Sequence, residues 1–294
     1  MDQQNDQTVV ITGGTGGIGF HSALGIAQTG ARVLVTGRNR ERGEEARARL
    51  IEESGHDHVD FVTGDLSSTE GIDALAEALM ERAPRIHVLV NNAGYLGNEP
   101  RTSPDGLEMH FAVNVLGPWR LTHALLPALD SAGGARVVNV TGGDKPAAID
   151  VENLQAEKGF RGLMTYTHSK SVMESMSLAM ADRLFAYGVS VNVVFPGRAS
   201  TNMTRSMKGS ALPGAMKLML PFFRLFFAED GGRSAAKAAR STIWAATTAD
   251  LKGISGRYYD THSREQSFHP TAYDATVQKD ILAALDLASG TNSA

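Results

Sequence analysis

Residues 8–19 read Thr-Val-Val-Ile-Thr-Gly-Gly-Thr-Gly-Gly-Ile-Gly, and this stretch decides the fold. Its first five residues form a β-branched, largely apolar run, which is typical of a strand. After the glycines, apolar residues recur at helical spacing through Gln28, and Gly30 ends that segment. This order predicts a strand, a tight glycine-rich turn and a helix that begins at the turn.

Two glycine patterns overlap in the turn. Gly14, Gly16 and Gly19 satisfy G-x-G-x-x-G. Gly13, Gly17 and Gly19 satisfy the looser G-x-x-x-G-x-G. A backbone without Cβ atoms can turn sharply and approach a pyrophosphate, while the amides at the helix N-terminus face its negative charge. An ordinary flexible turn is the alternative, but the strand–turn–helix context favours a dinucleotide site.

Strand-like and helical segments continue to alternate beyond this unit. Further strands are expected at 31–36, 59–63, 86–90, 136–140, 189–194 and 256–259, and further helices at 40–54, 70–82, 108–129 and 166–187. Such alternation predicts an α/β fold with a doubly wound parallel sheet of the Rossmann type, about seven strands wide, with helices on both faces. Because no linker interrupts the pattern, we expect one domain over 1–294.

Composition excludes several classes of protein. The 294 residues carry a net charge of −4, which lacks the basic excess typical of nucleic-acid-binding proteins. The chain has no cysteine, so disulfides and cysteine-based metal sites are impossible. Its nine histidines show no spacing typical of metal ligands, and we expect no metal.

The sequence shows no targeting or membrane-spanning segment. Residues 1–7 are polar and lack the basic and apolar regions of a signal peptide. No apolar run reaches the ~20 residues that a membrane span needs. We therefore expect a cytoplasmic protein without an integral membrane segment.

The end of the second expected strand predicts which nicotinamide cofactor binds. Residues 36–40 read Thr-Gly-Arg-Asn-Arg, without the acidic residue that binds the ribose hydroxyls in NAD-type sites. The planar guanidinium of Arg38 can instead pair with a 2′-phosphate. Alternatively, Arg38 and Arg40 are ordinary surface charges at the start of a helix. The first interpretation predicts NADPH (NADP) as cofactor.

Further motifs follow the strands in a specific order. They are Asp65-Leu66, Asn91-Asn-Ala-Gly94, Asn114 within Phe111-Ala-Val-Asn-Val-Leu-Gly117, Tyr166-Thr-His-Ser-Lys170 and Pro196-Gly197. Together with the glycine turn they resemble the short-chain dehydrogenase/reductase family over about residues 8–260. Residues 151–158, 223–226 and 256–259 resemble its retinol-dehydrogenase-like and WW-domain-oxidoreductase-like members, which often carry an N-terminal membrane anchor.

The resemblance implies a role for each matching residue. Asp65 and Leu66 would flank the adenine, and Asn92, Ala93 and Gly94 would line the cofactor channel. The implied cofactor-binding residues are Gly13, Thr15, Gly16, Gly17, Ile18, Gly19, Arg38, Asp65, Leu66, Asn92, Ala93, Gly94, Tyr166, Lys170, Pro196, Gly197 and Thr201, the last three at the nicotinamide end.

Tyr166 and Lys170 are the expected catalytic pair. They stand four apart and so share one helix face. An unperturbed tyrosine has a pKa near ~10, which a neighbouring ammonium lowers toward neutral pH. That spacing alone carries little weight, but the resemblance implies that Tyr166 donates the proton and Lys170 lowers its pKa. Asn114 would then hold a water that connects Lys170 to solvent.

The sequence departs from the family at the catalytic serine. Residues 138–144 read Val-Asn-Val-Thr-Gly-Gly-Asp, so Thr141 aligns with the first of two usual serines and Gly142 with the second, catalytic one. Thr141 could substitute for it after a small backbone shift. A substrate such as an iminium formed from a hemiaminal could need little oxyanion stabilisation. The protein could also have lost catalysis and kept cofactor binding.

Residues 198–230 do not fit the strand–helix rhythm. They are rich in Met and Phe and follow the sixth strand, where the family forms a substrate lid. We expect an adaptable apolar pocket wall and a bulky substrate. A core helix, an oligomer contact or a membrane-surface contact are alternatives.

These observations predict an NADPH-dependent reductase that acts on a small-molecule ketone, aldehyde or iminium/hemiaminal carbon. A non-catalytic NADPH-binding sensor or regulator is an alternative, and a lyase or epimerase on the same fold is another. The resemblance also implies a possible homo-oligomer formed through 108–129 and 166–187. Roles in detoxification, in resistance and in secondary metabolism all stay open.

Overall fold

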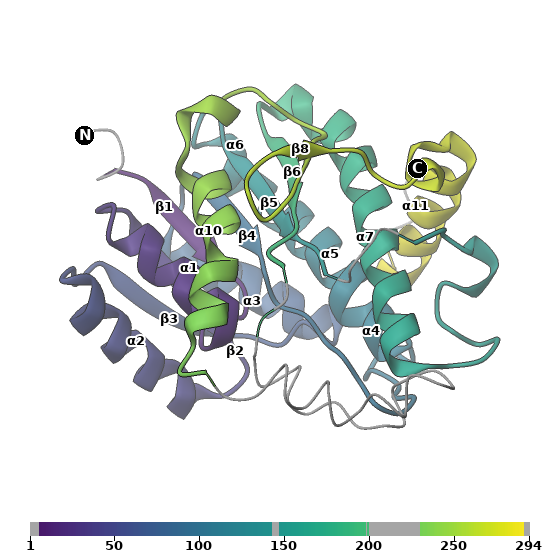
Figure 1. Ribbon diagram of the computed structural model, residues 1–294, viewed down its shortest axis with the longest axis horizontal. Coiled ribbons are helices and arrows are strands. Elements are labelled where there is room, and N and C mark those ends of the chain that lie inside the picture. The colour runs from purple at the N-terminus through teal and green to yellow at the C-terminus, as the bar shows by residue number, and fades with distance from the viewer. Residues whose placement is uncertain (1–5, 143–146, 198, 200–229, 291–294) are drawn as a thin grey trace.

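The computed structural model describes residues 6–142, 147–197, 199 and 230–290 (Figure 1). Almost all of the expected lid at 198–230, including Thr201, lies outside these residues.

The described strands form one sheet whose order shows double winding. The order is β3-β2-β1-β4-β5-β6-β7-β8, and every neighbouring pair is parallel except β7 and β8. The strands are β1 Thr8–Ile11, β2 Arg32–Gly37, β3 Val59–Thr63, β4 Val88–Asn91, β5 Arg136–Val140, β6 Ser190–Val194, β7 Tyr258–Tyr259 and β8 Glu265–Gln266. The α/β prediction is confirmed.

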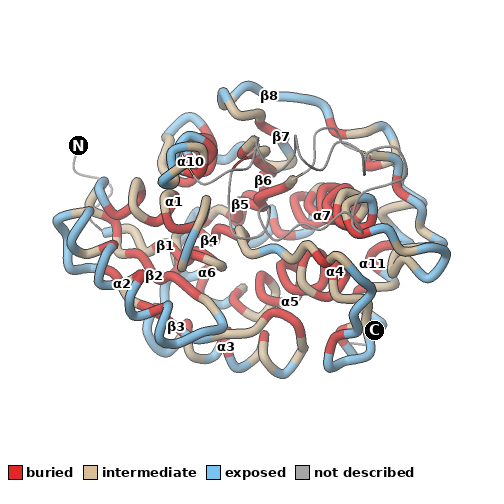
Figure 2. Tube along the Cα trace, turned by 60° about the horizontal axis from the view of Figure 1, so that its bottom comes forward, coloured by how far each residue is buried: buried red, intermediate tan, exposed pale blue. Residues whose placement is uncertain are grey.

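Helices cover both faces of this sheet (Figure 1). The longer ones are α1 Gly17–Ala27, α2 Arg40–Ser54, α3 Thr69–Arg82, α5 Gly117–Ala124, α7 Gly162–Leu184, α10 Arg233–Thr247 and α11 Ala275–Ser289. Alternate residues of a strand face opposite layers. Val9 and Ile11 pack with α1, α2 and α10, whereas Val10 packs with α3, α5 and α7. Figure 2 shows that the central strands are buried.

The sheet is one strand wider than expected. Strand β8 pairs antiparallel with β7, and both of its residues, Glu265 and Gln266, are exposed. A two-residue exposed strand has no apolar alternation that would mark it in a sequence.

The expected helix at 108–129 is divided. It comprises α4 Met109–Phe111, a π-helical turn Ala112–Leu116, α5, and α6 Leu126–Asp130. Pro118 and Pro127 are the second residues of α5 and α6, in the first turn, where a missing amide is tolerated. Helix α7 also begins earlier than expected, so Tyr166 lies in its second turn and not at its start.

The sequence order reverses between β1 and β4. Strands β2 and β3 lie on one side of β1, whereas β4, β5 and β6 continue on the other. In such sheets, ligands bind beyond the carboxyl ends of the strands at this reversal. The segments after β1, β4 and β5 meet there.

Candidate active site

The glycine turn after β1 leaves the start of α1 open. Gly13 and Gly17 have φ of 67° and 54°, a region that favours glycine. Gly16 is the N-cap of α1 and has no side chain that could cap the helix with a hydrogen bond. A Cβ added to Gly16 would meet no atom within 4 Å, and the first turn carries no acidic residue. The uncapped amides therefore fit an anionic group such as a pyrophosphate.

Other glycines of the turn allow close packing inside the protein. A Cβ on Gly14 would lie 2.6 Å from the Val35 side chain, and one on Gly19 would overlap the carbonyl oxygen of Gly13 and the amide of Asn92. The Asn92 amide also donates to the Thr12 carbonyl at 2.9 Å. Asn92, a predicted cofactor residue, thus braces the turn from β4.

The end of β2 lies beside this turn. A Cβ on Gly37 would lie 2.8 Å from the Thr15 methyl group, so the two segments touch. Arg38 follows and is exposed, and Asn39 caps α2 by accepting from the Arg42 amide at 2.9 Å. The structure brings the Arg38 backbone next to the glycine turn and leaves its side chain facing solvent.

The adenine-side residues differ in exposure. Asp65 is half-buried, and its carboxylate accepts the Ser67 amide at 3.0 Å. Leu66 is buried, and a Cβ added to Gly117 would lie 3.3 Å from the Cβ of Leu66. Leu66 therefore packs against the start of α5 as part of the core.

Lys170 is buried at the end of β5. Its ammonium group donates to the Val140 carbonyl oxygen at 3.0 Å, and the residue is 3% exposed. A Cβ on Gly94 would lie 3.7 Å from Nζ of Lys170 and 3.5 Å from Oδ1 of Asn114. Burial lowers the pKa of Lys170 to about 8, and the charge of Glu174 opposes this. The end of β5 and the segment after β4 therefore meet at Lys170.

Tyr166 lies one turn before Lys170. It is buried, and burial raises the pKa of its hydroxyl to about 12. In the protein alone the phenol is therefore protonated at neutral pH. Lowering this pKa requires positive charge beside the hydroxyl.

Asn114 connects the loop after β4 to α7. It lies in the π-helical turn and is fully buried. Its Oδ1 accepts the Tyr95 amide at 2.7 Å, while its Nδ2 donates to the Tyr95 carbonyl at 3.0 Å and to Oγ of Ser169 at 2.9 Å. Ser169 donates in turn to the Tyr166 carbonyl at 2.8 Å. This network fixes the loop relative to α7.

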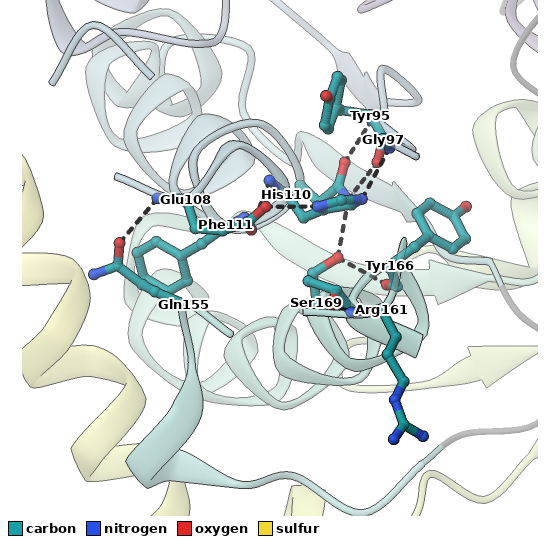
Figure 3. Close-up of polar contacts among 11 residues, drawn as sticks. Tyr95, Gly97, Glu108, His110, Phe111, Gln155, Arg161, Tyr166 and Ser169 are labelled. Carbon is teal, nitrogen blue, oxygen red and sulfur yellow. Dashed lines mark hydrogen bonds and ion pairs between the residues drawn. The ribbon is translucent and has the colours of Figure 1, made fainter. Parts of the chain in front are cut away.

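A buried histidine supports the same loop (Figure 3). Nε2 of His110 accepts the Gly97 amide at 3.0 Å, so the proton is on Nδ1, which donates to Glu108 at 2.7 Å. The Glu108 carboxylate also accepts the amides of His110 and Phe111 and caps the helical segment. His110 thus holds the segment from Tyr95 to Gly97 over Asn114.

Gly142, which aligns with the usual serine, lies against the Tyr166 hydroxyl. A Cβ built on Gly142 would overlap the hydroxyl oxygen of Tyr166. The hydroxyl thus occupies the space that any side chain at 142 would need. Thr141 is buried, and its own hydroxyl donates to Oε1 of Glu174 at 2.5 Å. That proton is directed to α7.

Glu174 and Ser169 were missed by the sequence analysis. Glu174 is buried, and burial raises its pKa to about 7, while Thr141 and Lys170 act in the opposite direction. One signal was present, because Glu174 stands four residues after Lys170 on a face shared with buried apolar residues. Ser169 carried no signal, since its role depends on Asn114 from another element.

The remaining predicted residues have separate positions. Ile18 packs against a small cluster that includes Ala235. Gly197 has φ of 87°, and a Cβ there would lie 2.7 Å from the Thr261 methyl group. Pro196 precedes it beyond β6, at the same edge of the sheet.

Within the described part of the chain, no group of three or more His, Asp or Glu side chains is arranged to hold a metal ion. None of the described helices is long and apolar enough to cross a membrane.

Known proteins resemble this chain over most of its length. A sequence model for the family described as short chain dehydrogenase matches residues 7–210. Retinol dehydrogenase 14 of Mus musculus is 33% identical, over 94% of this chain and 83% of that protein. Polyprenol dehydrogenase of Homo sapiens is 31% identical, over 94% of this chain and 83% of that protein.

Solved structures share the fold. The Pseudomonas aeruginosa RhlG/NADP active-site complex is 27% identical, with a TM-score of 0.64, over 87% of this chain and 94% of that chain. An uncharacterised protein from Mycobacterium paratuberculosis superimposes with a TM-score of 0.74 at 24% identity, over 97% of this chain and 94% of its own. The second likeness concerns the fold alone.

Proposed function

Since the chain belongs to the short chain dehydrogenase family, we propose that it is an NADPH-dependent reductase of a bulky carbonyl or iminium/hemiaminal carbon. Its likeness to retinol dehydrogenases confirms the branch of the family expected from the sequence. Oxidoreductase chemistry with a nicotinamide cofactor is common to this family. The observation that carries the proposal is that Tyr166 and Lys170 are both buried one turn apart on α7, with the Lys170 ammonium beside Gly94.

The choice of NADPH rests on the segment after β2. Arg38 lies next to the glycine turn, exposed, and no acidic residue stands between Thr36 and Arg40. Its guanidinium can form the two parallel hydrogen bonds that a 2′-phosphate accepts. The open amides at Gly16 and Gly17 would hold the pyrophosphate. When bound, the reduced nicotinamide supplies the hydride.

Tyr166 is the proton donor in this proposal. As the substrate carbon gains the hydride, Tyr166 gives its hydroxyl proton to the carbonyl oxygen, and an alcohol forms. Since burial raises the pKa of Tyr166, the phenolate needs a positive partner, which the Lys170 ammonium provides. For a hemiaminal, the same proton goes to the hydroxyl that leaves as water, and the iminium carbon then gains the hydride.

The absence of a side chain at Gly142 favours the second kind of substrate. A ketone that becomes an alkoxide gains most from an extra hydrogen-bond donor, whereas a cationic iminium carbon gains little. Thr141 already donates its proton to Glu174. Of the interpretations left open by the sequence, we therefore favour a reductase that works without the serine.

Turnover with matched variants tests the proposal. The protein is mixed with NADPH or NADH and a panel of aromatic ketones, retinal-like aldehydes and cyclic hemiaminals, and the nicotinamide absorbance is followed. We expect consumption of NADPH over NADH by the wild type, and a rate about 10³-fold lower in Tyr166→Phe. NADPH binding without consumption across the whole panel would instead favour a regulator, a lyase or an epimerase.

We further propose a single domain over 1–294, a cytoplasmic location and a possible homo-oligomer. Helix α11 packs against α7, so part of the α7 surface is already covered within the chain (Figure 1). Light scattering of the purified protein and fractionation of the cells that produce it test the oligomeric state and the location. Recovery in the membrane fraction would contradict the location.

A further inference from the structure

Glu174 is a buried carboxyl group without a role in the mechanism above. It lies one helical turn beyond Lys170 and is 3% exposed. Its Oε1 accepts the Thr141 hydroxyl, while its Oε2 is buried and has no hydrogen-bond partner among the described residues. A charged group in such a place is unfavourable unless another charge compensates it. A charged Glu174 therefore requires a compensating positive charge nearby.

The end of β5 holds both side chains. The Val140 carbonyl oxygen accepts the Lys170 ammonium at 3.0 Å, and the next residue, Thr141, donates to Glu174 at 2.5 Å. The last residue of β5 and the residue after it thus form hydrogen bonds with two side chains one turn apart on α7. Residues four apart on a helix face the same side, so opposite charges there attract each other.

Few other charged groups face this pair. On α7, Tyr166 precedes Lys170 by one turn. From β7, the buried Tyr258 faces Glu174. Burial raises the pKa of Tyr258, and the charge of Glu174 raises it further. In the part of the chain that the structure describes, the negative charge of Glu174 raises the pKa of Lys170, and the positive charge of Lys170 lowers the pKa of Glu174. Each is the charge partner of the other.

We propose that Glu174 is a positioning residue that keeps Lys170 in its ammonium form and commits the Thr141 hydroxyl to α7. This inference rests on the proposed function, in which Lys170 supports Tyr166. A buried ammonium loses its proton readily, and a carboxylate one turn away opposes that loss. Because Thr141 has a single hydroxyl proton, donating it to Glu174 withholds it from the substrate oxygen.

The pKa of Lys170 itself provides the test. We would label the lysines with ¹³C, assign the Lys170 signal with Lys170→Met, and titrate the wild type and Glu174→Gln by NMR. The neutral glutamine keeps the shape and removes the negative charge, so the ammonium loses support. We expect the Lys170 pKa to fall by about one pH unit. Asp182→Asn is the matched control, since it removes an exposed carboxylate from the same helix and should leave this pKa unchanged.

The pH dependence of turnover gives a second measurement. Reduction fails at high pH when Lys170 and Tyr166 lose their protons. A lower Lys170 pKa therefore moves the alkaline limb of kcat to lower pH in Glu174→Gln, by the same amount as in the NMR titration. A purely structural role would change kcat at every pH without moving the limb. The Kd for NADPH, measured by fluorescence, reports separately on cofactor binding.

The outcomes separate this inference from the proposed function. An unchanged Lys170 pKa in Glu174→Gln overturns the inference, whether or not the wild type turns over. A lowered pKa in a protein without Tyr166-dependent turnover overturns the proposed function alone. If Glu174→Gln does not fold, Thr141→Val replaces it. Losing the Thr141 hydrogen bond raises the Glu174 pKa and reduces its charge, so the Lys170 pKa falls in the same direction by less, and no fall overturns the inference.

Discussion

The turns after β1 and after β5 lie at the same edge of the sheet, and each depends on glycine for a different reason. In the first, Gly13 and Gly17 adopt positive φ, so the requirement lies in their own backbone. In the second, Gly142 is required by its neighbour, because the Tyr166 hydroxyl occupies the place of a Cβ. In the proposed function, the first turn binds the cofactor and the second leaves room for the Tyr166 hydroxyl.

Tyr166→Phe should produce the largest effect at the second turn. The ring and its packing remain, but the donated proton is lost, so kcat should fall about 10³-fold. The Kd for NADPH should stay within about twofold, because the glycine turn is untouched. Stopped-flow reduction and fluorescence binding measure the two quantities. Equal losses in both would contradict the division of roles between the turns.

Gly142→Ser tests whether the site only lacks the hydroxyl of a serine or needs glycine at this position to leave room for Tyr166. The new Cβ overlaps the Tyr166 hydroxyl, so Tyr166 must move, and a displacement of about 1 Å can lower kcat about 100-fold. Gly142→Ala is the matched control, because it adds the same Cβ without a hydroxyl and should lose as much. A higher kcat in Gly142→Ser alone would show that the site simply lacks its donor.

Arg38→Asp should act only at the first turn. Replacing the guanidinium by a carboxylate repels a 2′-phosphate, so the KM for NADPH should rise about tenfold or more, while kcat at saturation holds. Arg40→Asp introduces the same charge two residues away and should change the KM less. Unchanged use of NADPH by Arg38→Asp, with NADH already preferred by the wild type, would reject the cofactor choice.

Thr141→Ala should produce the smallest of the four changes. Its hydroxyl proton is donated to Glu174, so its loss should lower kcat at pH 7 by less than about tenfold, equivalent to ~1.4 kcal/mol. Thr141→Ser keeps the hydrogen bond and serves as the control. A loss of 100-fold in steady-state kcat would instead make Thr141 the substitute for the serine.

Much of this could be predicted because it depends on neighbours in the chain. The strand–turn–helix unit at 8–28, the alternation of strands and helices and the shared helix face of Tyr166 and Lys170 all follow from periodicity and spacing. The strand β8 was missed because two exposed residues carry no pattern. The roles assigned to the individual site residues stay predictions until the variants are measured.

Other features depend on residues far apart in the sequence. Asn114 was predicted as a single functional residue, but its π-helical turn and its bonds to Tyr95 and Ser169 appear only when three segments meet. Glu174 stands among apolar residues of a helix, and its link to Thr141 spans 33 positions. No local pattern encodes such a contact.

The sequence by itself determined the family, the sheet, the glycine turn and the helical pair of Tyr166 and Lys170, since backbone preferences and spacing are local properties. Only the tertiary structure decided what lies beside Gly142. The absence of a serine is visible in the sequence, but the Tyr166 hydroxyl in its place results from how α7 packs against the end of β5. The same packing sets Glu174 against Thr141, because side chains 33 residues apart meet only when helix and strand are folded together.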